Sequence, residues 1–382
     1  MEWSATMPDP TISVMHVTDS GGPGGAETIF LQTTASIDRS RFRSVAVVGY
    51  RGWLAEQLET RGLRPHIVPA IGSFNGRYLI RLLRLARQDK TDVIVAHLYG
   101  SAVYASLAGI ILSIPVVSVL HGQTDVPQEE RFASLKSAIV RRGSRKVVFV
   151  SERLQDHLAP RLALAQSQCA VIPNGVDTEV FRSCPDRSLR TELTLPDDAI
   201  LVGAIGNIRA PKAYDVLLHA ARLLVDRSPR FHFVIAGDGA NRLGDELNEL
   251  SRKLAIEDHV TFLGLRPDVA RVLNNLDAYV LSSHTEGFSI ACVEAMACGV
   301  PVVATRSGGP EEILAGEAGV LVPPDDPTAI ADALDRVVGS KDLASALTVR
   351  ALRRVRQEYS LGTMVARYED LLASVVRGSA AP

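Results

Sequence analysis

The chain has 382 residues, of which 46% are hydrophobic and 22% are charged, and its formal net charge at pH 7 is -2. This length is enough for two or three domains, each with its own hydrophobic core. A charge balance so close to neutral argues against a protein that binds nucleic acid through a basic surface.

The cysteines and the N-terminus argue against two further classes of protein, those held together by zinc or disulfides and those with a signal peptide. The 4 cysteines form no C-x-x-C pair and have no histidine cluster near them, so we expect neither a structural zinc site nor a disulfide framework. The first 11 residues lack the basic and apolar segments of a signal peptide. We therefore expect a cytoplasmic protein, and association with the inner face of the membrane stays open.

In the N-terminal half, short apolar runs typical of buried strands alternate with helical patterns. The expected strands are Ile12–Val17, Ser44–Val48, His66–Val68, Val93–Ala96, Val116–Leu120 and Lys146–Val150. Such an alternation predicts a parallel sheet with helices on both faces. Ligands of these sheets bind beyond the carboxyl ends of the strands, so the loops after the strands are where chemistry is expected.

The loop after the first expected strand is rich in glycine and reads D-S-G-G-P-G-G-A-E from Asp19 to Glu27. Glycines allow the backbone to approach a bulky anion closely. The spacing is not the G-x-G-x-x-G of dinucleotide-binding folds. A flexible turn without a ligand remains the alternative.

A basic helix and an uncharged stretch follow. Four arginines at positions 77, 81, 84 and 87 fall on one face of a predicted helix. An ordinary solvated face is the simpler interpretation, and a face that contacts anionic lipid is the alternative. The uncharged stretch Ala102–Leu120 divides at Pro115 into a helix and a strand, each short for a bilayer, so it does not favour a membrane span.

Two histidines follow strands of this half, His97 and His121. A lone histidine at a strand end is more often a structural hydrogen-bonding residue than a functional one. We favour that structural interpretation for His97.

A second α/β alternation begins after residue 198. Its expected strands are Ile200–Ile205, Phe231–Ala236, Val260–Leu263, Ala278–Leu281, Val300–Ala304 and Val320–Val322. We expect a first domain at residues 1–178, a polar, proline-punctuated linker at 179–198 and a second domain at 199–359. The predicted architecture is two doubly wound, Rossmann-like parallel-sheet domains that face each other across a cleft.

The most informative stretch is 282–312, which contains two glutamates eight positions apart, Glu286 and Glu294. Between them, the amides of Gly287, Phe288, Ser289 and Ile290 fall at or just before the start of a predicted helix. Amides at a helix start lack intrahelical acceptors and can hold a phosphate. Acids that merely favour a helix N-terminus would explain one glutamate but not the whole pattern.

This stretch carries a family resemblance. The sequence E-G-F-S-I-A-C-V-E from Glu286 to Glu294 resembles the E-x7-E signature of the retaining GT-B glycosyltransferases, in particular the glycosyl transferases group 1 class, family 4. The segments A-C-G-V-P-V-V-A-T, from residue 297, and I-P-N-G-V-D, from residue 172, resemble the same family. The resemblance implies a GT-B fold and a metal-independent transfer of a sugar from a nucleotide-sugar donor, a UDP- or GDP-sugar.

The resemblance also implies roles for single residues. Glu294 would bind the ribose hydroxyls and Glu286 the hydroxyls of the transferred sugar. Gly24 and Gly25 would close over the donor phosphates, and His121, followed by Gly122 as in the family, would lie beside the transferred sugar. Activity would then require the two domains to close.

The cationic part of the site departs from the family pattern. Lys212 matches the lysine that neutralises the diphosphate, but Asn207 stands where arginine is common and Ala213 where glycine is common. Arg209 is the candidate for the missing charge. At the end of the chain, residues 360–377 resemble the terminal helix that packs back on the first domain.

No D-x-D triplet occurs in the chain, so we expect no metal site and no cofactor. A GT-B nucleotide-sugar epimerase and a non-catalytic nucleotide-sugar-binding protein remain alternatives, and a pyridoxal-phosphate phosphorylase is a more distant one. The acceptor stays unidentified, because the loops that would form its pocket, 50–53, 71–77 and 124–131, carry no recognisable signature.

Overall fold

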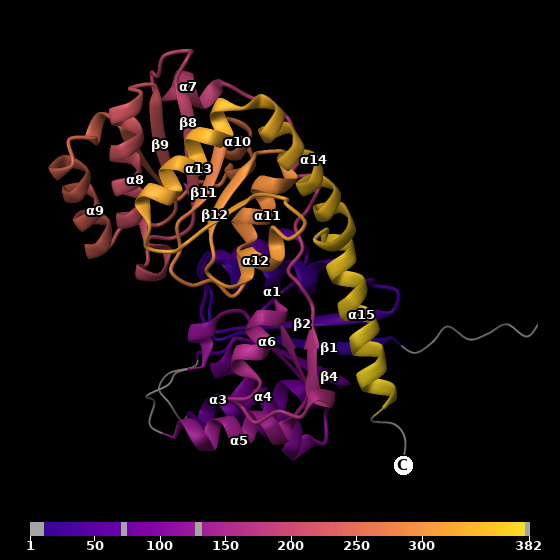
Figure 1. The fold of residues 1–382 in the computed structure, drawn as a ribbon. Coiled ribbons are helices and arrows are strands. Elements are labelled where there is room, and N and C mark those ends of the chain that lie inside the picture. Colours follow the sequence, from indigo (N-terminus) through magenta and orange to yellow (C-terminus); the bar gives the residue numbers. More distant parts are fainter. Residues whose placement is uncertain (1–10, 70–74, 127–131, 379–382) are drawn as a thin grey trace, which may run out of the picture. The chain divides into compact units, whose positions relative to one another are not determined.

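The structure is a computed structural model that describes residues 11–69, 75–126 and 132–378. The chain forms two compact units (Figure 1). Unit 1 comprises Met1–Ile172 with Met364–Pro382, and unit 2 comprises Pro173–Thr363. The first 10 residues and most of the loops at 71–77 and 124–131 lie outside the described residues.

Unit 1 contains a parallel sheet of 7 strands in the order β3-β2-β1-β4-β5-β6-β7. The strands are β1 (Ile12–Val17), β2 (Phe42–Val48), β3 (His66–Ile67), β4 (Val93–His97), β5 (Val116–Leu120), β6 (Ser144–Phe149) and β7 (Cys169–Val171). The strand order reverses between β1 and β4, which is the point where open α/β sheets bind ligands.

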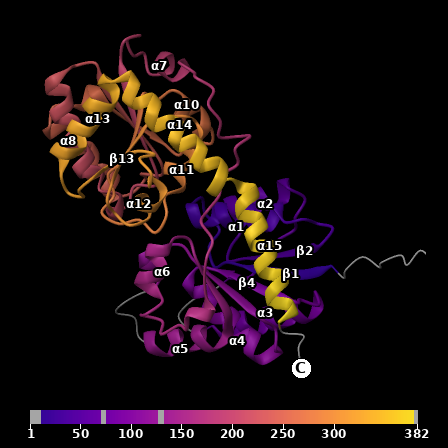
Figure 2. The same cartoon turned by 45° about the vertical axis from the view of Figure 1, so that its right-hand side comes forward.

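Helices connect these parallel strands. They are α1 (Gly25–Ser36), α2 (Trp53–Thr60), α3 (Gly76–Gln88), α4 (Tyr99–Leu112), α5 (Ala133–Gly143) and α6 (Glu152–Leu158), with short 3-10 turns η1 (Gln123–Asp125) and η2 (Gln166–Gln168). Figures 1 and 2 show α3, α4 and α5 next to one another. The strands β1, β4 and β5 are buried almost throughout, as expected for a sheet covered on both faces.

Unit 2 contains a parallel sheet of 6 strands in the order β10-β9-β8-β11-β12-β13, which reverses between β8 and β11. The strands are β8 (Ile200–Ile205), β9 (Phe231–Ala236), β10 (Val260–Gly264), β11 (Ala278–Leu281), β12 (Val302–Thr305) and β13 (Val320–Val322). The helices are α7 (Ser188–Glu192), α8 (Tyr214–Arg227), α9 (Arg242–Lys253), α10 (Val269–Asn274), α11 (Ile290–Ala297), α12 (Gly309–Ile313), α13 (Pro327–Gly339) and α14 (Lys341–Glu358), with 3-10 turns η3 (Ala210–Lys212) and η4 (Glu257–His259).

The prediction of two doubly wound parallel-sheet units is confirmed. Each expected strand has a counterpart, and six of them have the predicted bounds, because a continuous apolar run fits only a strand buried on both faces. The stretch Ala102–Leu120 divides at residues 113–115, which include Pro115, between the end of α4 and the start of β5, as predicted. Within the described ranges, no helix combines the length and the apolar composition needed to cross a membrane.

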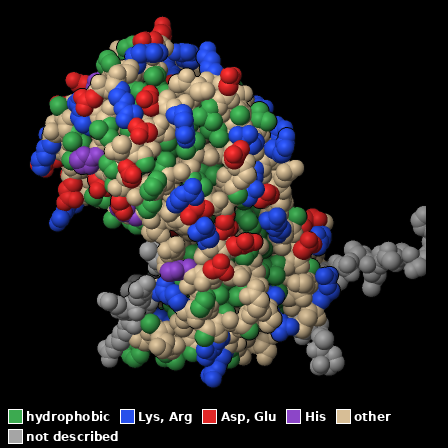
Figure 3. All heavy atoms as spheres, viewed as in Figure 1, with side chains coloured by type: hydrophobic (Ala, Val, Ile, Leu, Met, Phe, Trp, Pro, Cys, Tyr) green, Lys and Arg blue, Asp and Glu red, His purple; other side chains and the backbone are tan. Residues whose placement is uncertain are grey.

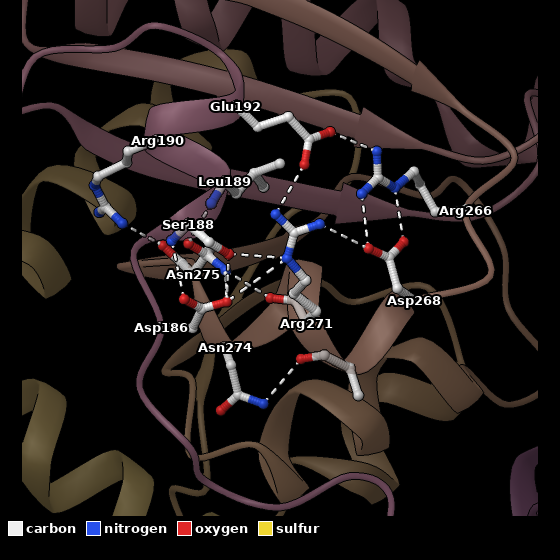
Figure 4. A network of polar contacts seen from close by, with 11 residues as sticks. Asp186, Ser188, Leu189, Arg190, Glu192, Arg266, Asp268, Arg271, Asn274 and Asn275 are labelled. Carbon is white, nitrogen blue, oxygen red and sulfur yellow. Dashed lines mark hydrogen bonds and ion pairs between the residues drawn. The ribbon is translucent and has the colours of Figure 1, made fainter.

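The segment 179–198, which we expected to be a linker, lies within unit 2 and is fastened to the end of α10. Asn275 accepts from the amide of Leu189 (2.9 Å) and donates to Asp186 (3.1 Å). The buried guanidinium of Arg190 donates to the carbonyl of Asn275 (2.7 Å) and pairs with Asp277 (2.6 Å). Figure 4 shows the contacts of Asn275 with Asp186, Leu189 and Arg190. A segment with so many buried partners is part of a domain rather than a free connection.

The last helix, α15 (Leu361–Arg377), lies largely within unit 1. The carboxylate of Glu369 accepts from the amide of Asp38 (2.8 Å) and pairs with Arg41 (3.0 Å). Tyr368 and Leu372 are fully buried. The C-terminal segment therefore packs against the beginning of the chain.

Candidate functional site

In unit 2, the strand order brings two predicted site loops to the same edge of the sheet. The loop after β8 contains Lys212, and the loop after β11 contains Glu286. Because β8 and β11 are neighbouring parallel strands at the point of reversal, both loops leave the carboxyl edge together. Main-chain and side-chain bonds join them: the amide of His284 donates to Pro211 (2.9 Å), and the hydroxyl of Ser282 donates to the carbonyl of Lys212 (2.9 Å).

The Nζ of Lys212 and Oε1 of Glu286 form an ion pair at 2.7 Å. The same carboxylate oxygen accepts from the hydroxyl of Ser283, also at 2.7 Å. The main chain of Glu286 is held on both sides, since its amide donates to Ser307 (2.7 Å) and its carbonyl accepts from Gly309 (3.0 Å). The acid is thus fixed in position, and no hydrogen bond joins its other oxygen, Oε2, to another described residue.

The helix α11 begins where the sequence predicts. Ser289 is its N-cap, and the Ser289 hydroxyl accepts from the amide of Cys292 (3.3 Å). The amides of Ile290 and Ala291, in the first turn, have no acceptor within the helix and lie at its positive end. Phe288, next to the cap, is buried and packs edge-on against Tyr359, with ring centroids 5.7 Å apart. The local geometry therefore suits an anion at the start of α11.

Glu294 lies one turn further along α11 and is partly buried. Its carboxylate has no hydrogen-bond or ion-pair partner among the described residues. Burial raises the pKa of Glu294 to about 7. An acid that is buried without a partner is costly, and such groups occur more often at functional sites than elsewhere.

The position where arginine was expected, Asn207, makes a structural contact instead. Its side chain accepts from the amide of Asp238 (3.1 Å). The neighbouring Gly237 comes so close to the loop that a Cβ there would lie 2.1 Å from the carbonyl oxygen of Gly206. Arg209 is exposed, and no ion pair of its guanidinium is found among the described residues. It is therefore free to meet an anion.

In unit 1, the glycine-rich loop leads into α1, whose N-cap is Gly24 and whose first residue is Gly25. A Cβ at Gly24 would lie 2.3 Å from the carboxylate of Glu27, so any other residue at position 24 would displace this side chain. The other oxygen of that carboxylate accepts from the hydroxyl of Ser20. Glu27 is thus turned back toward its own loop.

His121, the predicted site residue of unit 1, is joined to His97. The Nδ1 of His97 and Nε2 of His121 are 3.1 Å apart, and the two rings stack with centroids 5.2 Å apart. His97 is completely buried in β4, whereas His121 stays partly exposed in the loop after β5. Burial lowers the pKa of His121 to about 4, and it lowers the pKa of His97 well below its usual value, so both rings are neutral at pH 7.

Sequence reasoning missed two acids near this pair, Asp19 and Asp125. The amide of His121 donates to Asp125 (2.6 Å). Burial raises the pKa of Asp125 to about 6, and the negative charges of Asp19 and Glu27 act in the same direction. Burial also raises the pKa of Asp19. Asp19 lies in the loop just after β1, so its position beyond the carboxyl end of a buried strand was the available signal.

No group of three or more histidines, cysteines, aspartates or glutamates in the described part of the chain is arranged to hold a metal ion. All four cysteines are free thiols.

Comparison with known proteins identifies the family. The model of Glycosyltransferase Family 4 matches residues 23–180, and that of Glycosyl transferases group 1 matches residues 199–340. A D-inositol 3-phosphate glycosyltransferase of Stackebrandtia nassauensis is 31% identical over 87% of this chain and 83% of its own length. An N-acetyl-alpha-D-glucosaminyl L-malate synthase of Bacillus anthracis is 28% identical over 78% of each chain.

Solved structures share the fold at low sequence identity. The Anabaena protein HepE, solved in complex with UDP and glucose, superimposes with a TM-score of 0.85 at 21% identity and covers 95% of this chain and all of its own. WaaG, a glycosyltransferase involved in lipopolysaccharide biosynthesis, gives a TM-score of 0.74 at 14% identity and covers 94% of this chain and 99% of its own. The chain therefore belongs to the glycosyl transferases group 1, family 4, and is a glycosyltransferase with the GT-B fold.

Proposed function

We propose that this enzyme moves a sugar from a nucleotide-sugar donor to an acceptor hydroxyl, with retention of the anomeric configuration. The observation that carries this proposal is the cluster at the carboxyl edge of the unit 2 sheet. There Lys212 pairs with Glu286 at 2.7 Å, and the acid lies in the loop that leads into α11, whose first amides suit an anion. Few ligands other than a phosphate joined to a polyol require a cation, free amides and carboxylates together.

In this proposal the donor diphosphate is met by Lys212, by Arg209 and by the amides at the start of α11. The positive groups stabilise the charge that develops on the leaving diphosphate. Glu286 accepts from hydroxyls of the transferred sugar with its free Oε2, and Glu294 accepts from the ribose hydroxyls. No metal ion is needed for these contacts.

In unit 1, we propose that Gly24 and Gly25 contact the donor phosphates and that His121 contacts the transferred sugar. The bond between the anomeric carbon and the diphosphate breaks, and the acceptor oxygen forms its bond on the same face of the sugar. The acceptor proton passes to the departing phosphate oxygen. This route needs no nucleophile from the enzyme.

The nucleobase can be identified with a thermal-shift panel of UDP-, GDP- and ADP-sugars. A ligand that binds only the native state raises the apparent melting temperature in proportion to its affinity. The Anabaena relative of similar fold was solved with UDP-glucose, so UDP-sugars are the first to test. We expect one nucleotide class to raise the melting temperature clearly more than the other two.

The carboxylates are tested by Glu286→Ala and Glu294→Ala. Each variant should lose about 10²- to 10³-fold in nucleoside diphosphate release, because it removes contacts that strengthen in the transition state. Glu317→Ala, on an exposed surface of unit 2, is the control and should keep wild-type turnover. Wild-type turnover in either of the first two variants would refute the assigned site.

The same assay separates the alternatives. A non-catalytic binding protein would give a thermal shift without release of nucleoside diphosphate. An epimerase would convert the sugar without an acceptor, and a product with the transferred sugar on an acceptor would exclude it. The relatives act on D-inositol 3-phosphate and L-malate by their names, so small hydroxyl compounds are the first acceptors to supply, followed by lipid-linked ones.

Contact with an anionic membrane is a further part of the proposal, supported by α3. Its four arginines are exposed, and none forms an ion pair with another described residue. Ile80 on α3 and Ile110 and Ile111 on the adjacent α4 are each about half exposed. Apolar and basic side chains are both visible at the lower edge of Figure 3, where α3 and α5 lie in Figure 1. A basic face interspersed with apolar side chains is typical of helices that bind anionic lipid at the membrane surface.

Liposome co-sedimentation with and without anionic lipid tests this contact. Arg81→Glu with Arg84→Glu should abolish binding at low salt. Arg242→Glu on α9 is the matched control, because Arg242 is equally exposed but already paired with Glu246. No binding of the wild-type protein at low salt would refute the membrane contact and leave the donor site unaffected.

A further inference from the structure

The bonded histidine pair of unit 1 leaves two ring nitrogens without partners. The Nδ1 of His97 and Nε2 of His121 share one hydrogen bond. The Nε2 of His97 and Nδ1 of His121 are both covered and have no hydrogen-bond partner among the described residues. Since a neutral imidazole carries one N–H and one bare nitrogen, the shared bond determines the tautomers of both rings together.

Only two arrangements are open to the neutral pair. In the first, His97 donates from Nδ1, and His121 accepts at Nε2 and carries its own proton on Nδ1. In the second, His121 donates from Nε2, and His97 carries its proton on Nε2. Each arrangement leaves one N–H without an acceptor: on His121 in the first, and on His97 in the second.

The surroundings of the two rings favour the first arrangement. An N–H that is buried without an acceptor costs about 1–3 kcal/mol. His97 has no exposed surface, and its ring packs against the edge of Phe30, with centroids 5.3 Å apart. Both unpaired nitrogens are covered, but His121 is in a partly exposed loop at the ligand-binding edge of the sheet. Nδ1 of His121 is therefore the nitrogen that a small shift of this loop on ligand binding would open to an accepting oxygen.

We propose that His97 is a positioning residue, which holds His121 as the tautomer that carries its hydrogen on Nδ1. His121 then presents a hydrogen-bond donor, and its ligand atom is an oxygen that accepts, such as a sugar hydroxyl or carbonyl oxygen. His121 cannot take the proton of the acceptor, because Nδ1 already carries one and Nε2 is bonded to His97. The link to sugar rests on the proposed function, whereas the tautomer does not.

The first test is the tautomer itself in the wild-type protein. Long-range ¹H–¹⁵N correlation spectra of the ¹⁵N-histidine-labelled enzyme distinguish Nδ1–H from Nε2–H rings, and loss of one signal in His121→Gln assigns the peak. We expect His121 as the Nδ1–H tautomer and His97 also as the Nδ1–H tautomer. An Nε2–H pattern for His121 would overturn the proposal.

The second test uses substitutions of His97. His97→Asn keeps an N–H close to the position of Nδ1, and His97→Leu removes it. We expect His97→Leu to give mixed tautomers at His121 and to lower kcat about tenfold, the equivalent of one hydrogen bond, with little change in the donor KM. His97→Asn should restore the tautomer and most of kcat.

His16 provides the matched control. It is as completely buried as His97 and also meets the edge of Phe30, with centroids 6.2 Å apart, but no described residue forms a hydrogen bond with either of its ring nitrogens. His16→Leu should therefore leave the His121 tautomer unchanged. An unchanged tautomer and kcat in His97→Leu would contradict the positioning role. If the wild-type protein shows the expected tautomer but His121→Gln keeps wild-type turnover, only the role of His121 in catalysis is refuted.

Discussion

At the reversal point of unit 2, a lysine and a glutamate lie 2.7 Å apart, whereas at that of unit 1 two histidines lie 3.1 Å apart. The lysine and glutamate are partly accessible, and Arg209 nearby is exposed. The histidines are neutral because burial lowers the pKa of each. The same sheet topology thus supports charged groups in one unit and neutral ones in the other.

The charged groups of unit 2 and the neutral groups of unit 1 suit different parts of a nucleotide sugar. A diphosphate carries charge that grows as it leaves, so it requires cations and free amides. Sugar hydroxyls are neutral, and a neutral donor fixed in one tautomer can select them without attracting phosphate. The charges that act on Asp125 in unit 1 are those of Asp19 and Glu27, so the surroundings of this acid suit a neutral sugar better than a charged group.

Removal of the cation at the unit 2 edge should have the largest effect. Lys212→Ala leaves Glu286 with Ser283 as its remaining partner and takes the positive charge from the diphosphate. We expect kcat/KM to fall about 10²- to 10³-fold. Steady-state release of nucleoside diphosphate measures this loss.

Arg209→Ala is the comparison for that variant. Its guanidinium is exposed and has no ion-pair partner in the described ranges, so solvent weakens its interaction with an anion. We expect a loss of about tenfold or less. A larger loss than in Lys212→Ala would mean that Arg209 has taken over the charge of the arginine absent at position 207.

The sequence predicted the local features of these edges well. The helix start expected at or just after residues 287–290 is confirmed, since α11 begins at Ile290. Helix ends depend on a few neighbouring side chains. The short strand β7, at Cys169–Val171, was missed because its three residues are only partly buried and a run of this length does not indicate a strand by itself.

Contacts between distant segments could not be predicted in the same way. The bond between His97 and His121 depends on the register of β4 and β5, in which His97 lies beside Val119. The segment around Arg190 looks like a linker because its polar residues and prolines resemble those of a loop. Its partners, Asn275 and Asp277, are more than 80 positions further along the chain.

Loss of the buried cation in that segment should destabilise unit 2 strongly. Arg190 is 5% exposed and holds three polar groups: the carboxylate of Asp277 and the carbonyls of Asn275 and Ala199. Arg190→Leu should lower the free energy of unfolding by about 2–3 kcal/mol, less than for a fully buried pair because Asp277 remains partly in solvent. Urea unfolding with pulse proteolysis at sites in unit 2 measures the change.

The exposed Arg187 is the control for this variant, because within the described part of the chain its side chain donates only to the main chain of Asp197. Arg187→Leu should change the free energy of unfolding by less than about 0.5 kcal/mol. If the two substitutions lower the free energy of unfolding equally, the buried charge of Arg190 is not what holds segment 179–198 to unit 2.

Glu294 offers a stability change of opposite sign. Burial raises its pKa from 4.5 to about 7 in the native state, so the native carboxyl holds its proton more tightly than the unfolded one. The free energy of unfolding should therefore fall as the pH rises from about 4.5 to 7 and stay low above that. Glu294→Gln, which cannot ionise, should be more stable than the wild type by about 1–2 kcal/mol at pH 8, a value reduced for partial exposure.

The two proteins should be equally stable at pH 4, where Glu294 is protonated in both states. The same pulse-proteolysis measurement at both pH values provides the check. A variant less stable than the wild type at pH 8 would show that the Glu294 carboxylate has a stabilising partner. Gain of stability with loss of turnover would instead identify Glu294 as a residue kept for binding at the expense of stability.

The same experiment can be made on Asp125 in unit 1, where we expect the smallest change in the free energy of unfolding. Its pKa rises from 3.8 to about 6, so the free energy of unfolding should fall between about pH 4 and pH 6. Asp125→Asn should gain about 1 kcal/mol at pH 7.5 and nothing at pH 4, because the amide oxygen can still accept from His121. Both tryptophans of the chain, including Trp53 in α2, are in unit 1, so their fluorescence during urea unfolding reports this unit alone.

The gain in the free energy of unfolding of Asp125→Asn shows how far the acids at the unit 1 edge are protonated near neutral pH. The main-chain bonds from His121 and Gly122 stabilise the ionised form of Asp125 and oppose the effect of burial, so its gain should be smaller than that of Glu294. A gain as large as that of Glu294→Gln would mean that the acids of unit 1 repel one another strongly enough to hold Asp125 protonated near neutral pH. The unit 1 edge would then present a second neutral donor beside His121, and the contrast with the charged edge of unit 2 would be sharper than the histidines alone make it.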